Sequence, residues 1–474
     1  MKRIKNIIFK IVGIISLVVF CVFSALLLML GMLPTKYLTL FFVIFIILYL
    51  IFLMFIFVKK IKNKLKITAV IFLILFALVF GIGIKYLSET IEFMDVINNK
   101  LLQKESYYVM TLKDSKITKI EELRNQKIGL YNSLNSEHAL EELNTKINVK
   151  HIEYKDIVEL FEDLQEQKID AVLINDSIKN LLETDLSHMK ILLKEIDKVF
   201  ISIEKEDIVK VVDVTKKTFN VYVAGGDAYG SIDNVTNTDV NMLITVDPVK
   251  RKMLLTSIPR DYYVNLPSFG ENAYDKLTHA GYYGIEESVK AIEKLLDVDI
   301  NYYAKVNFST IEGVIDAIGG VEVYSDYNFC VFERTDLCYK KGYNYLGGYK
   351  ALTFARERYS FSDGDVQRIK NQQRVLEAII NKITNSTAII TNYSEILDSV
   401  SSNFSTNLDS KSINRLVKMQ LNDMRGWSIE STNLVGTDLY TKNTYTFPGT
   451  ELYVMQRDKQ SIQTVKDKIK QYLN

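Results

Sequence analysis

The sequence predicts an α/β protein anchored by three transmembrane helices. Two observations lead to this prediction. Three long apolar runs open the chain, and beyond them short β-branched runs alternate with segments of helical periodicity. A chain of 474 residues is long enough for two or three domains. We expect the membrane helices in residues 1–87, a small α/β accessory domain in residues 88–212 and a second α/β domain in residues 213–474.

The three apolar runs are Ile7 to Leu30, Tyr37 to Val58 and Ile67 to Leu87. A helix needs about 20 apolar residues to cross the hydrocarbon core of a bilayer, and each run is long enough. A cleaved signal peptide is the alternative for the first run. However, the apolar part of a signal peptide is shorter, and no small-residue cleavage site precedes the second run.

Basic residues predict the orientation of these helices, because cytoplasmic loops are enriched in Lys and Arg. The turn between the first and second runs holds only Lys36. The other basic residues are Lys2, Arg3, Lys5 and Lys10 before the first run and Lys59, Lys60, Lys62, Lys64 and Lys66 between the second and third. We therefore expect a multi-pass protein of the cell membrane with a cytoplasmic N-terminus and extracellular C-terminal domains.

The net charge argues against a nucleic-acid partner. The formal charge of the whole chain is +1, which gives no broad basic field. An outward-facing domain would also be separated from DNA by the membrane. We therefore expect no nucleic acid among the partners, and a reading as a transcriptional regulator is disfavoured.

The three cysteines agree with an outer location for most of the chain. Cys21 lies inside the first apolar run, and Cys330 and Cys338 are the only cysteines beyond residue 88. An oxidising compartment permits a disulfide between the last two, but two free buried thiols are an equal alternative at this spacing. The stretch offers too few ligands for zinc.

The accessory region alternates strand-like and helical segments from residue 127 onward. The stretch KITKIEELRNQKIGLYN resembles one lobe of extracellular solute-binding proteins. A structural α/β spacer is the alternative to a ligand-binding domain.

Two aspartates lie at the ends of predicted strands in the second domain. Asp227 follows the strand in NVYVAGGDAYG, and Asp239 directly precedes the strand in NTDVNMLITVDP. Neighbouring carboxylates supply the oxygen ligands that a hard cation such as magnesium prefers. Each aspartate taken alone is more typical of a turn or helix cap.

Arginines accompany the next segments. Arg260 ends the apolar strand of LLTSIPRDYYV, and Arg356 and Arg358 lie two apart after the helix of GGYKALTFARERY, which points both to one side if the chain is extended. In the helix that follows, Arg368 and Gln372 are four apart and share a face. We expect the apolar stripe of this helix, Val366, Ile369, Leu376, Ile379 and Ile380, to be buried.

These arginines suit a diphosphate. The guanidinium group binds phosphate oxygens with a planar fork, and a helix start adds partial positive charge. If Arg260, Arg356, Arg358 and Arg368 converge, they form a diphosphate pocket, and Asp227 with Asp239 would hold the bridging cation. Between these segments AYDKLTHAGYYG contains Asp275, Lys276 and His279, and we expect a structural role for the histidine.

Seven motifs in order resemble the LytR-CpsA-Psr family of cell-wall ligases. They are GGDAYG, NTDVNML, SIPRDYYV, DKLTHAGYYG, YYAKVNFSTIEGVIDAIGGVEV, LGGYKALTFARERY and GDVQRIKNQQRV. The resemblance spans about residues 217–474, and the anchor followed by an extra outer domain resembles the capsule-associated CpsA branch. It implies a domain with a central mixed sheet flanked by helices.

The resemblance also implies an activity. Such enzymes transfer a capsular or teichoic-acid-like glycopolymer from a polyprenyl diphosphate carrier to peptidoglycan. Here it implies that Asp227 and Asp239 hold magnesium or manganese. It further implies that Arg260, Arg356, Arg358 and Arg368, with Gln372 beside them, hold the diphosphate, and that apolar residues line a tunnel for the polyprenyl chain. Asp239, Arg260 and Arg356 are the expected catalytic residues, with Asp239 as proton acceptor.

Expected partners are the carrier-linked glycopolymer, peptidoglycan, the membrane and capsule or cell-wall assembly proteins. A hydrolase of polyprenyl diphosphate and a non-catalytic receptor for the lipid carrier are the alternative functions. The sequence departs from the family pattern at the glycine that precedes Asp227 and at Lys370 and Asn371, where a second arginine is usual. The segment between Cys330 and Cys338 is not a family hallmark.

Overall fold

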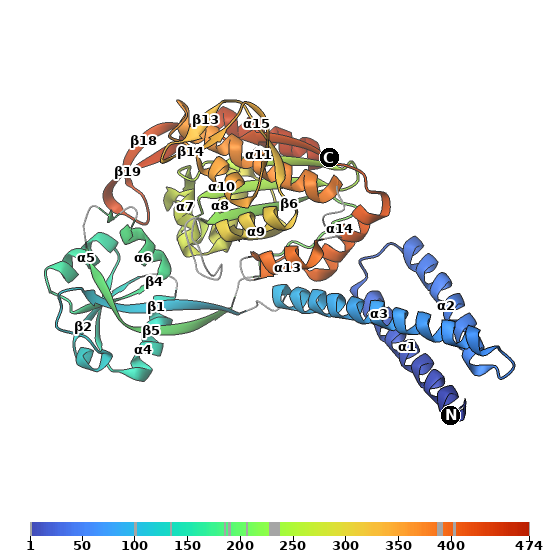
Figure 1. Ribbon diagram of the computed structural model, residues 1–474. Coiled ribbons are helices and arrows are strands. Elements are labelled where there is room, and N and C mark those ends of the chain that lie inside the picture. The colour runs from blue at the N-terminus through green and yellow to red at the C-terminus, as the bar shows by residue number, and fades with distance from the viewer. Residues whose placement is uncertain are drawn as a thin grey trace. The chain divides into compact units, whose positions relative to one another are not determined.

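The computed structural model describes most of the chain (Figure 1). The described residues are 2–98, 102–132, 135–183, 186–187, 191–204, 207–226, 238–385, 392–401 and 404–473. Contacts between residues divide the chain into two compact units. One unit comprises residues 1–98, 213–215 and 409–426, and the other comprises residues 99–212, 216–408 and 427–474.

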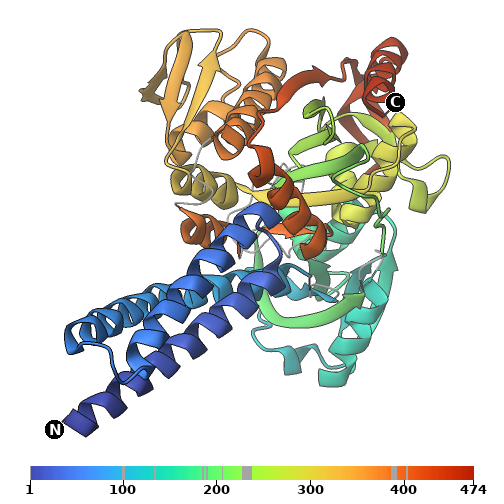
Figure 2. The same cartoon turned by 90° about the vertical axis from the view of Figure 1, so that its right-hand side faces the viewer.

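Three apolar helices form most of the first unit. They are α1 (Lys2–Leu30), α2 (Thr35–Phe57) and α3 (Asn63–Asn98), and all three are long and apolar enough to cross a membrane. Both ribbon views show them side by side (Figures 1 and 2). This confirms the prediction of three N-terminal membrane helices.

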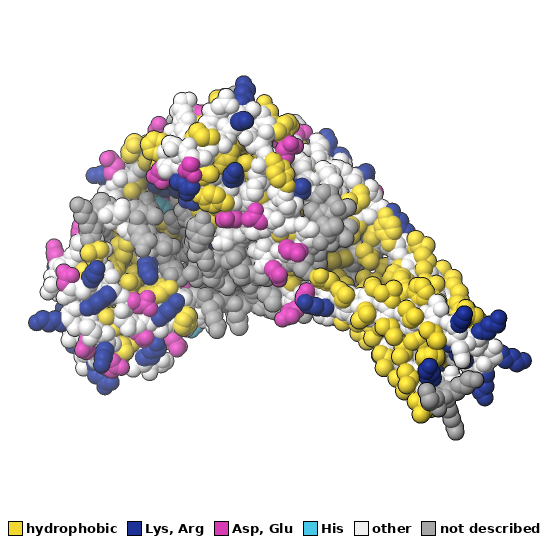
Figure 3. Space-filling view, viewed as in Figure 1, with side chains coloured by type: hydrophobic (Ala, Val, Ile, Leu, Met, Phe, Trp, Pro, Cys, Tyr) yellow, Lys and Arg dark blue, Asp and Glu magenta, His cyan; other side chains and the backbone are white. Residues whose placement is uncertain are grey.

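The surface of these helices matches a lipid environment. Figure 3 shows hydrophobic side chains along the visible face of the helices and a cluster of Lys and Arg at one end. Two buried polar side chains of the bundle are hydrogen-bonded: Ser16 Oγ donates to the carbonyl of Leu73 at 2.8 Å, and Tyr49 OH donates to the carbonyl of Ser16 at 3.0 Å. Such pairing removes the cost of a polar group in hydrocarbon.

Helix α14 (Ser410–Asp423) packs with the membrane helices. Ile413 and Val417 contact an apolar cluster formed by Leu30, Met32 and Met94 at the C-terminal ends of α1 and α3. Asn414 Nδ2 also donates to the carbonyl of Leu30 at 2.7 Å. A segment late in the chain is therefore fastened to the ends of α1 and α3.

The accessory region folds around a five-stranded sheet of order β3-β2-β4-β1-β5. Its elements are β1 (Leu102–Leu112), β2 (Lys127–Tyr131), α4 (Ser136–Lys146), β3 (Lys150–Tyr154), α5 (Ile157–Gln165), β4 (Ala171–Asn175), α6 (Asp176–Glu183) and β5 (Leu193–Glu204). Strands β2, β3 and β4 are parallel, and β1 is antiparallel to β4 and β5. The predicted alternation of strands and helices is present.

A six-stranded mixed sheet of order β16-β11-β6-β7-β8-β17 forms the centre of the C-terminal region. Its strands are β6 (Phe219–Gly226), β7 (Val240–Asp247), β8 (Lys252–Ile258), β11 (Tyr302–Asn307), β16 (Phe404–Thr406) and β17 (Ser428–Asn433). Strand β6 is parallel to β11 and antiparallel to β7, which is antiparallel to β8. This confirms the expected mixed sheet.

Helices cover both faces of this sheet (Figures 1 and 2). The side with Tyr222 and Leu243 packs against apolar residues of α8 and α15, such as Ile292 and Ile469. The opposite side faces α9, α10 and α11. The helices of this region are α7 (Leu277–Ala280), α8 (Ile285–Leu296), α9 (Phe308–Ala317), α10 (Gly348–Arg356), α11 (Gly364–Asn385), α13 (Tyr393–Ser401) and α15 (Lys459–Leu473).

Four two-stranded ribbons complete the C-terminal region. Their strands are β9 (Tyr263–Asn265), β10 (Tyr274–Lys276), β12 (Val321–Ser325), β13 (Phe329–Val331), β14 (Arg334–Tyr339), β15 (Gly342–Leu346), β18 (Gly436–Asn443) and β19 (Pro448–Arg457). In α11 one expectation was wrong. Ile379 is buried as predicted, and Ile369, Leu376 and Ile380 are half-buried. However, Val366 is 42% exposed, because the buried side of α11 at this end runs through Gln367 and Asn371.

Candidate active site

The strand order explains why Asp239 and Arg260 meet. Asn241 near the start of β7 pairs with Ile258 at the end of β8, so the residues just outside these strand ends lie opposite each other. Arg260 Nη1 donates to Asp239 Oδ1 at 2.8 Å. Asp239 is also tied to the next strand, because its N–H donates to the carbonyl of Gly225 at 2.8 Å. The antiparallel register therefore creates this ion pair.

The Arg260 side chain lies among three carboxylates. Its Nε atom is 3.4 Å from Asp261 Oδ2, and Lys276 Nζ is 3.5 Å from the other oxygen of Asp261. Burial lowers the pKa of the Arg260 guanidinium, but Asp239, Asp261 and Asp365 outweigh it and raise the pKa above its ordinary value. The guanidinium is therefore held charged and in a fixed direction.

Arg358 and Arg368 form the other half of the site. Asp365 Oδ1 lies 3.1 Å from Arg368 Nη2 and 3.8 Å from Arg358 Nη1. Burial lowers the pKa of Arg368, and the positive charges of Arg260 and Arg358 lower it further against the opposing carboxylates. Arg358 and Arg368 therefore share one carboxylate, and Arg260 is close enough for its charge to act on Arg368.

Arg356 and Gln372 lie on the wall of an apolar cavity. The cavity lies between the sheet and helices α9, α10 and α11. The Arg356 guanidinium lies 4.2 Å from the centre of the Phe308 ring, which also lines the cavity. The rest of the lining is apolar apart from Asn307: Val223, Gly225, Gly226, Val240, Met242, Val306, Ile311, Leu352, Ala355, Val375, Leu376 and Ile379.

A glycine lets the strands approach closely beneath this cavity. A Cβ added at Gly225 would lie 2.9 Å from the Cβ of Val240 on the adjacent strand. Gly225 is the second-last residue of β6 and its carbonyl accepts from the backbone N–H of Asp239, so a side chain there would push apart the strands that carry the site. The first glycine of the pair therefore has a packing role.

A molecule with an anionic head and an apolar tail fits this arrangement. Guanidinium groups bind phosphate oxygens through charge-assisted hydrogen bonds, and an apolar cavity binds hydrocarbon by removing it from water. The structure brings together Asp239, Arg260, Arg358 and Arg368, and it places Arg356 and Gln372 on the cavity wall.

Asp227, the second expected metal ligand, lies outside the described residues. In the described part of the chain, no group of three or more His, Cys, Asp or Glu side chains has the geometry of a metal site. Magnesium is usually held by one or two carboxylates together with substrate phosphates. The partly buried carboxylate of Asp239 next to the arginines fits one position of such a set.

Sequence reasoning missed three charged residues of the site. The sequence predicted Asp365 only as a candidate helix N-cap and Asp261 only as a structural ion-pair partner of the adjacent Arg260, and it predicted no role for Lys276. The signal for Asp365 was its position three residues before Arg368 on one helix, which places the two side chains together. No local pattern indicates the contact between Asp261 and Lys276, because it joins separate segments.

His279 has the structural role that the sequence favoured. It is fully buried, and its Nδ1 lies 2.6 Å from Asp275 Oδ1. The other Asp275 oxygen accepts from the backbone N–H of Thr446 at 2.7 Å, and the ring of Phe447 lies 5.4 Å from the imidazole. The pair fastens the 274–284 segment to the turn before β19.

Two family profiles match the chain. The profile of the LytR_cpsA_psr family matches residues 187–469, which is more than half of the chain. A profile described as NMT1/THI5 like matches residues 96–217, the accessory region.

Two teichoic acid transferases and a solved transferase structure are similar to the C-terminal region of this chain. The polyisoprenyl-teichoic acid-peptidoglycan teichoic acid transferase TagT of Bacillus subtilis strain 168 is 31% identical over 270 residues, which are 55% of this chain and 79% of TagT. The transferase TagU of Enterococcus faecalis is 32% identical over 218 residues, 45% of this chain and 70% of TagU. A solved structure of TagT bound to LI-WTA has 29% identity and a TM-score of 0.45, covering 56% of this chain and 94% of that one. The family profile matches more than half of the chain and includes every described site residue from Asp239 to Gln372. The chain therefore belongs to the LytR-CpsA-Psr family.

Proposed function

We propose that this protein is a membrane-anchored transferase that moves a glycopolymer from a polyprenyl diphosphate carrier to peptidoglycan. One observation carries the proposal: an apolar cavity is lined by Arg356 and Gln372, and its wall also includes Val240, the residue after Asp239. Asp239 is ion-paired with Arg260. The diphosphate binds Arg260, Arg356, Arg358 and Arg368, with Gln372 beside it, and the polyprenyl chain enters the cavity. The names of TagT and TagU, which describe the same type of transfer, support this.

The reaction needs positioning and charge neutralisation more than a covalent intermediate. A hydroxyl oxygen of peptidoglycan attacks the phosphorus that bears the glycopolymer. The bond from this phosphorus to the bridging oxygen breaks, and polyprenyl phosphate leaves. Asp239, which is ion-paired with Arg260 through Oδ1, accepts the hydroxyl proton. The arginines stabilise the charge on the phosphate oxygens.

Magnesium or manganese is part of the proposal. Asp239 would hold the cation together with Asp227 and the diphosphate oxygens. When bound, a divalent cation neutralises phosphate charge and orients the transferred group.

A transfer assay with metal removal tests this function. The full-length protein in lipid nanodiscs is mixed with a polyprenyl diphosphate-linked oligosaccharide and peptidoglycan fragments. We expect sugar phosphate on the peptidoglycan, loss of transfer with EDTA and recovery with excess magnesium. Asp239→Asn should lower the rate by about 100-fold or more, because it loses both the proton acceptor and a metal ligand. Asp467→Asn, an exposed aspartate on α15, should leave the rate unchanged.

Other outcomes would replace this function with an alternative. Release of free sugar phosphate without transfer indicates a hydrolase. Carrier binding without any reaction, at every metal tested, indicates a receptor. Full activity in EDTA would contradict only the proposed role of the metal, and the transferase function would stand.

The orientation of the membrane helices is also proposed, with the N-terminus in the cytoplasm and the domains after α3 outside. Engineered cysteines in a Cys21→Ala background test it. A membrane-impermeant maleimide should label Lys150→Cys in intact cells, because that residue is exposed in the accessory region. It should label Lys60→Cys, in the loop after α2, only after permeabilisation. The reverse pattern would contradict the orientation.

A further inference from the structure

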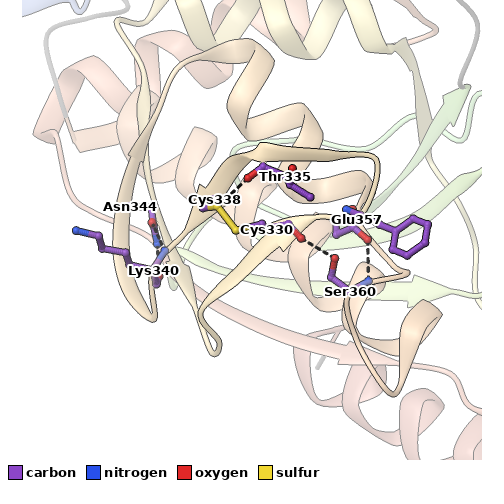
Figure 4. Close-up of a disulfide and its surroundings, with 8 residues drawn as sticks. Cys330, Thr335, Cys338, Lys340, Asn344, Glu357 and Ser360 are labelled. Carbon is purple, nitrogen blue, oxygen red and sulfur yellow. Dashed lines mark hydrogen bonds between the residues drawn. A yellow bond between two sulfur atoms is a disulfide. The ribbon is translucent and has the colours of Figure 1, made fainter.

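The β13–β14 hairpin plays no part in the mechanism proposed above, yet it is covalently closed. Cys330 lies opposite Cys338 in the register of the two strands, and a disulfide joins them (Figure 4). Both cysteines are exposed at the surface. The sequence left this pairing open, and the structure shows it formed.

The hairpin packs on α10, the helix that ends at Arg356. Phe354 of this helix is fully buried, and its ring centre lies 5.6 Å from that of Phe329 and 5.2 Å from that of Tyr339. Tyr339 OH also donates to the carbonyl of Lys350 at 2.7 Å. Both strands of the hairpin therefore contact α10.

Glu357 joins the same hairpin to the loop after α10. Its side chain is buried, and its Oε2 accepts from the backbone N–H of Phe332 at 3.1 Å. Its Oε1 accepts from the backbone N–H of Ser360 at 2.9 Å, and Ser360 Oγ donates to the carbonyl of Cys330 at 2.6 Å (Figure 4). A buried carboxylate needs such donors because it has lost its water.

Glu357 lies between the two arginines in the sequence, and its side chain has different neighbours from theirs. It directly follows Arg356, the last residue of α10, and has extended backbone angles. Glu357 is buried, whereas Arg356 is exposed and Arg358 is partly buried. The Arg356 guanidinium lies 4.2 Å from the centre of the Phe308 ring, and Arg358 Nη1 lies 3.8 Å from Asp365 Oδ1.

We propose that Glu357 is a positioning residue, and that the disulfide-closed hairpin is the support that lets it orient Arg356 and Arg358 toward the carrier diphosphate. The inference rests on the proposed function. Ligand groups held in their binding directions before the ligand arrives lose less entropy on binding. Carrier affinity therefore depends on an intact disulfide, although neither cysteine contacts the site.

The test measures geranyl diphosphate binding and transfer kinetics on the full-length protein in nanodiscs. Glu357→Ala should weaken binding and raise KM for the carrier by about tenfold to a hundredfold, because displaced ligand groups lose their alignment. Glu357→Gln, which keeps one acceptor oxygen, should recover part of the loss. Cys330→Ser with Cys338→Ser should shift KM in the same direction, as should reduction of the parent protein. KM for peptidoglycan should stay unchanged.

Two controls separate positioning from folding and from the proposed function. Glu333→Ala removes an exposed glutamate of the same hairpin and should behave like the parent. If Arg356→Ala and Arg358→Ala weaken binding but the Glu357 and cysteine variants do not, the inference is wrong and the proposed function stands. If the arginine variants also bind normally, the diphosphate pocket itself is wrong. A fall in active fraction with unchanged carrier KM would show a purely structural role and overturn the inference.

Discussion

Arg260→Ala is expected to lower the rate of transfer by about 1,000-fold, the size of effect seen when an arginine that stabilises phosphoryl charge is lost. In the structure this side chain is held between Asp239 and Asp261 and shares its field with Arg368. Its removal takes away a phosphate ligand and leaves Asp239 without its ion-pair partner. The measurement is the initial rate of sugar-phosphate transfer at saturating carrier.

Two further variants isolate the cause. Arg260→Lys keeps the charge but loses the planar fork, so we expect only partial recovery. Arg124→Ala removes an exposed arginine from the accessory region and should leave the rate unchanged. Circular dichroism should show that all three variants are folded. A folded Arg260→Ala protein with near-normal activity would remove Arg260 from the site.

Val223→Trp is expected to weaken binding of the long-chain carrier by about a hundredfold. Val223 lies on β6 and faces the cavity, so an indole ring there occupies space proposed for the polyprenyl chain. Excluding about four methylene groups costs about 3 kcal/mol, or two orders of magnitude in affinity. Inorganic pyrophosphate should still bind, because the arginines are untouched. Competition binding with the two ligands checks this.

The matched controls use the same substitution elsewhere and a smaller side chain at the same site. Val249→Trp changes a valine that is 58% exposed in the turn between β7 and β8 and should not affect binding. Val223→Ala enlarges the cavity and should retain the long-chain carrier. If Val223→Trp binds the long-chain carrier normally, the polyprenyl chain does not enter this cavity.

Local pattern was sufficient for much of the fold. The three membrane helices follow from composition alone, because a bilayer demands long apolar helices whatever they pack against. The ends of β6 and β8 could also be predicted from the sequence, since glycine and proline interrupt the apolar runs there. An extended end after the helix of GGYKALTFARERY was predicted as well, but α10 continues to Arg356, so the extended chain begins only at Glu357.

Several features depend on contacts between distant segments. Val366 was expected in the core because it fits the periodicity of α11, yet it is exposed since the buried side of the helix there carries the polar residues Gln367 and Asn371. Asp261 meets Lys276 only because the chain returns through the β9–β10 ribbon. The attachment of α14 to Leu30 and Met94 joins segments more than 300 residues apart.

By itself, the sequence determined which segments enter the membrane, which residue types could bind a diphosphate, and that they lie at strand and helix ends. Hydropathy and periodicity are local properties, so they can be read without knowing the fold. Only the tertiary structure decided that Arg260, Arg358 and Arg368 share one field, that Arg356 and Gln372 border an apolar cavity, and that a disulfide supports Glu357. These depend on strand register and helix packing, which are set by the whole chain.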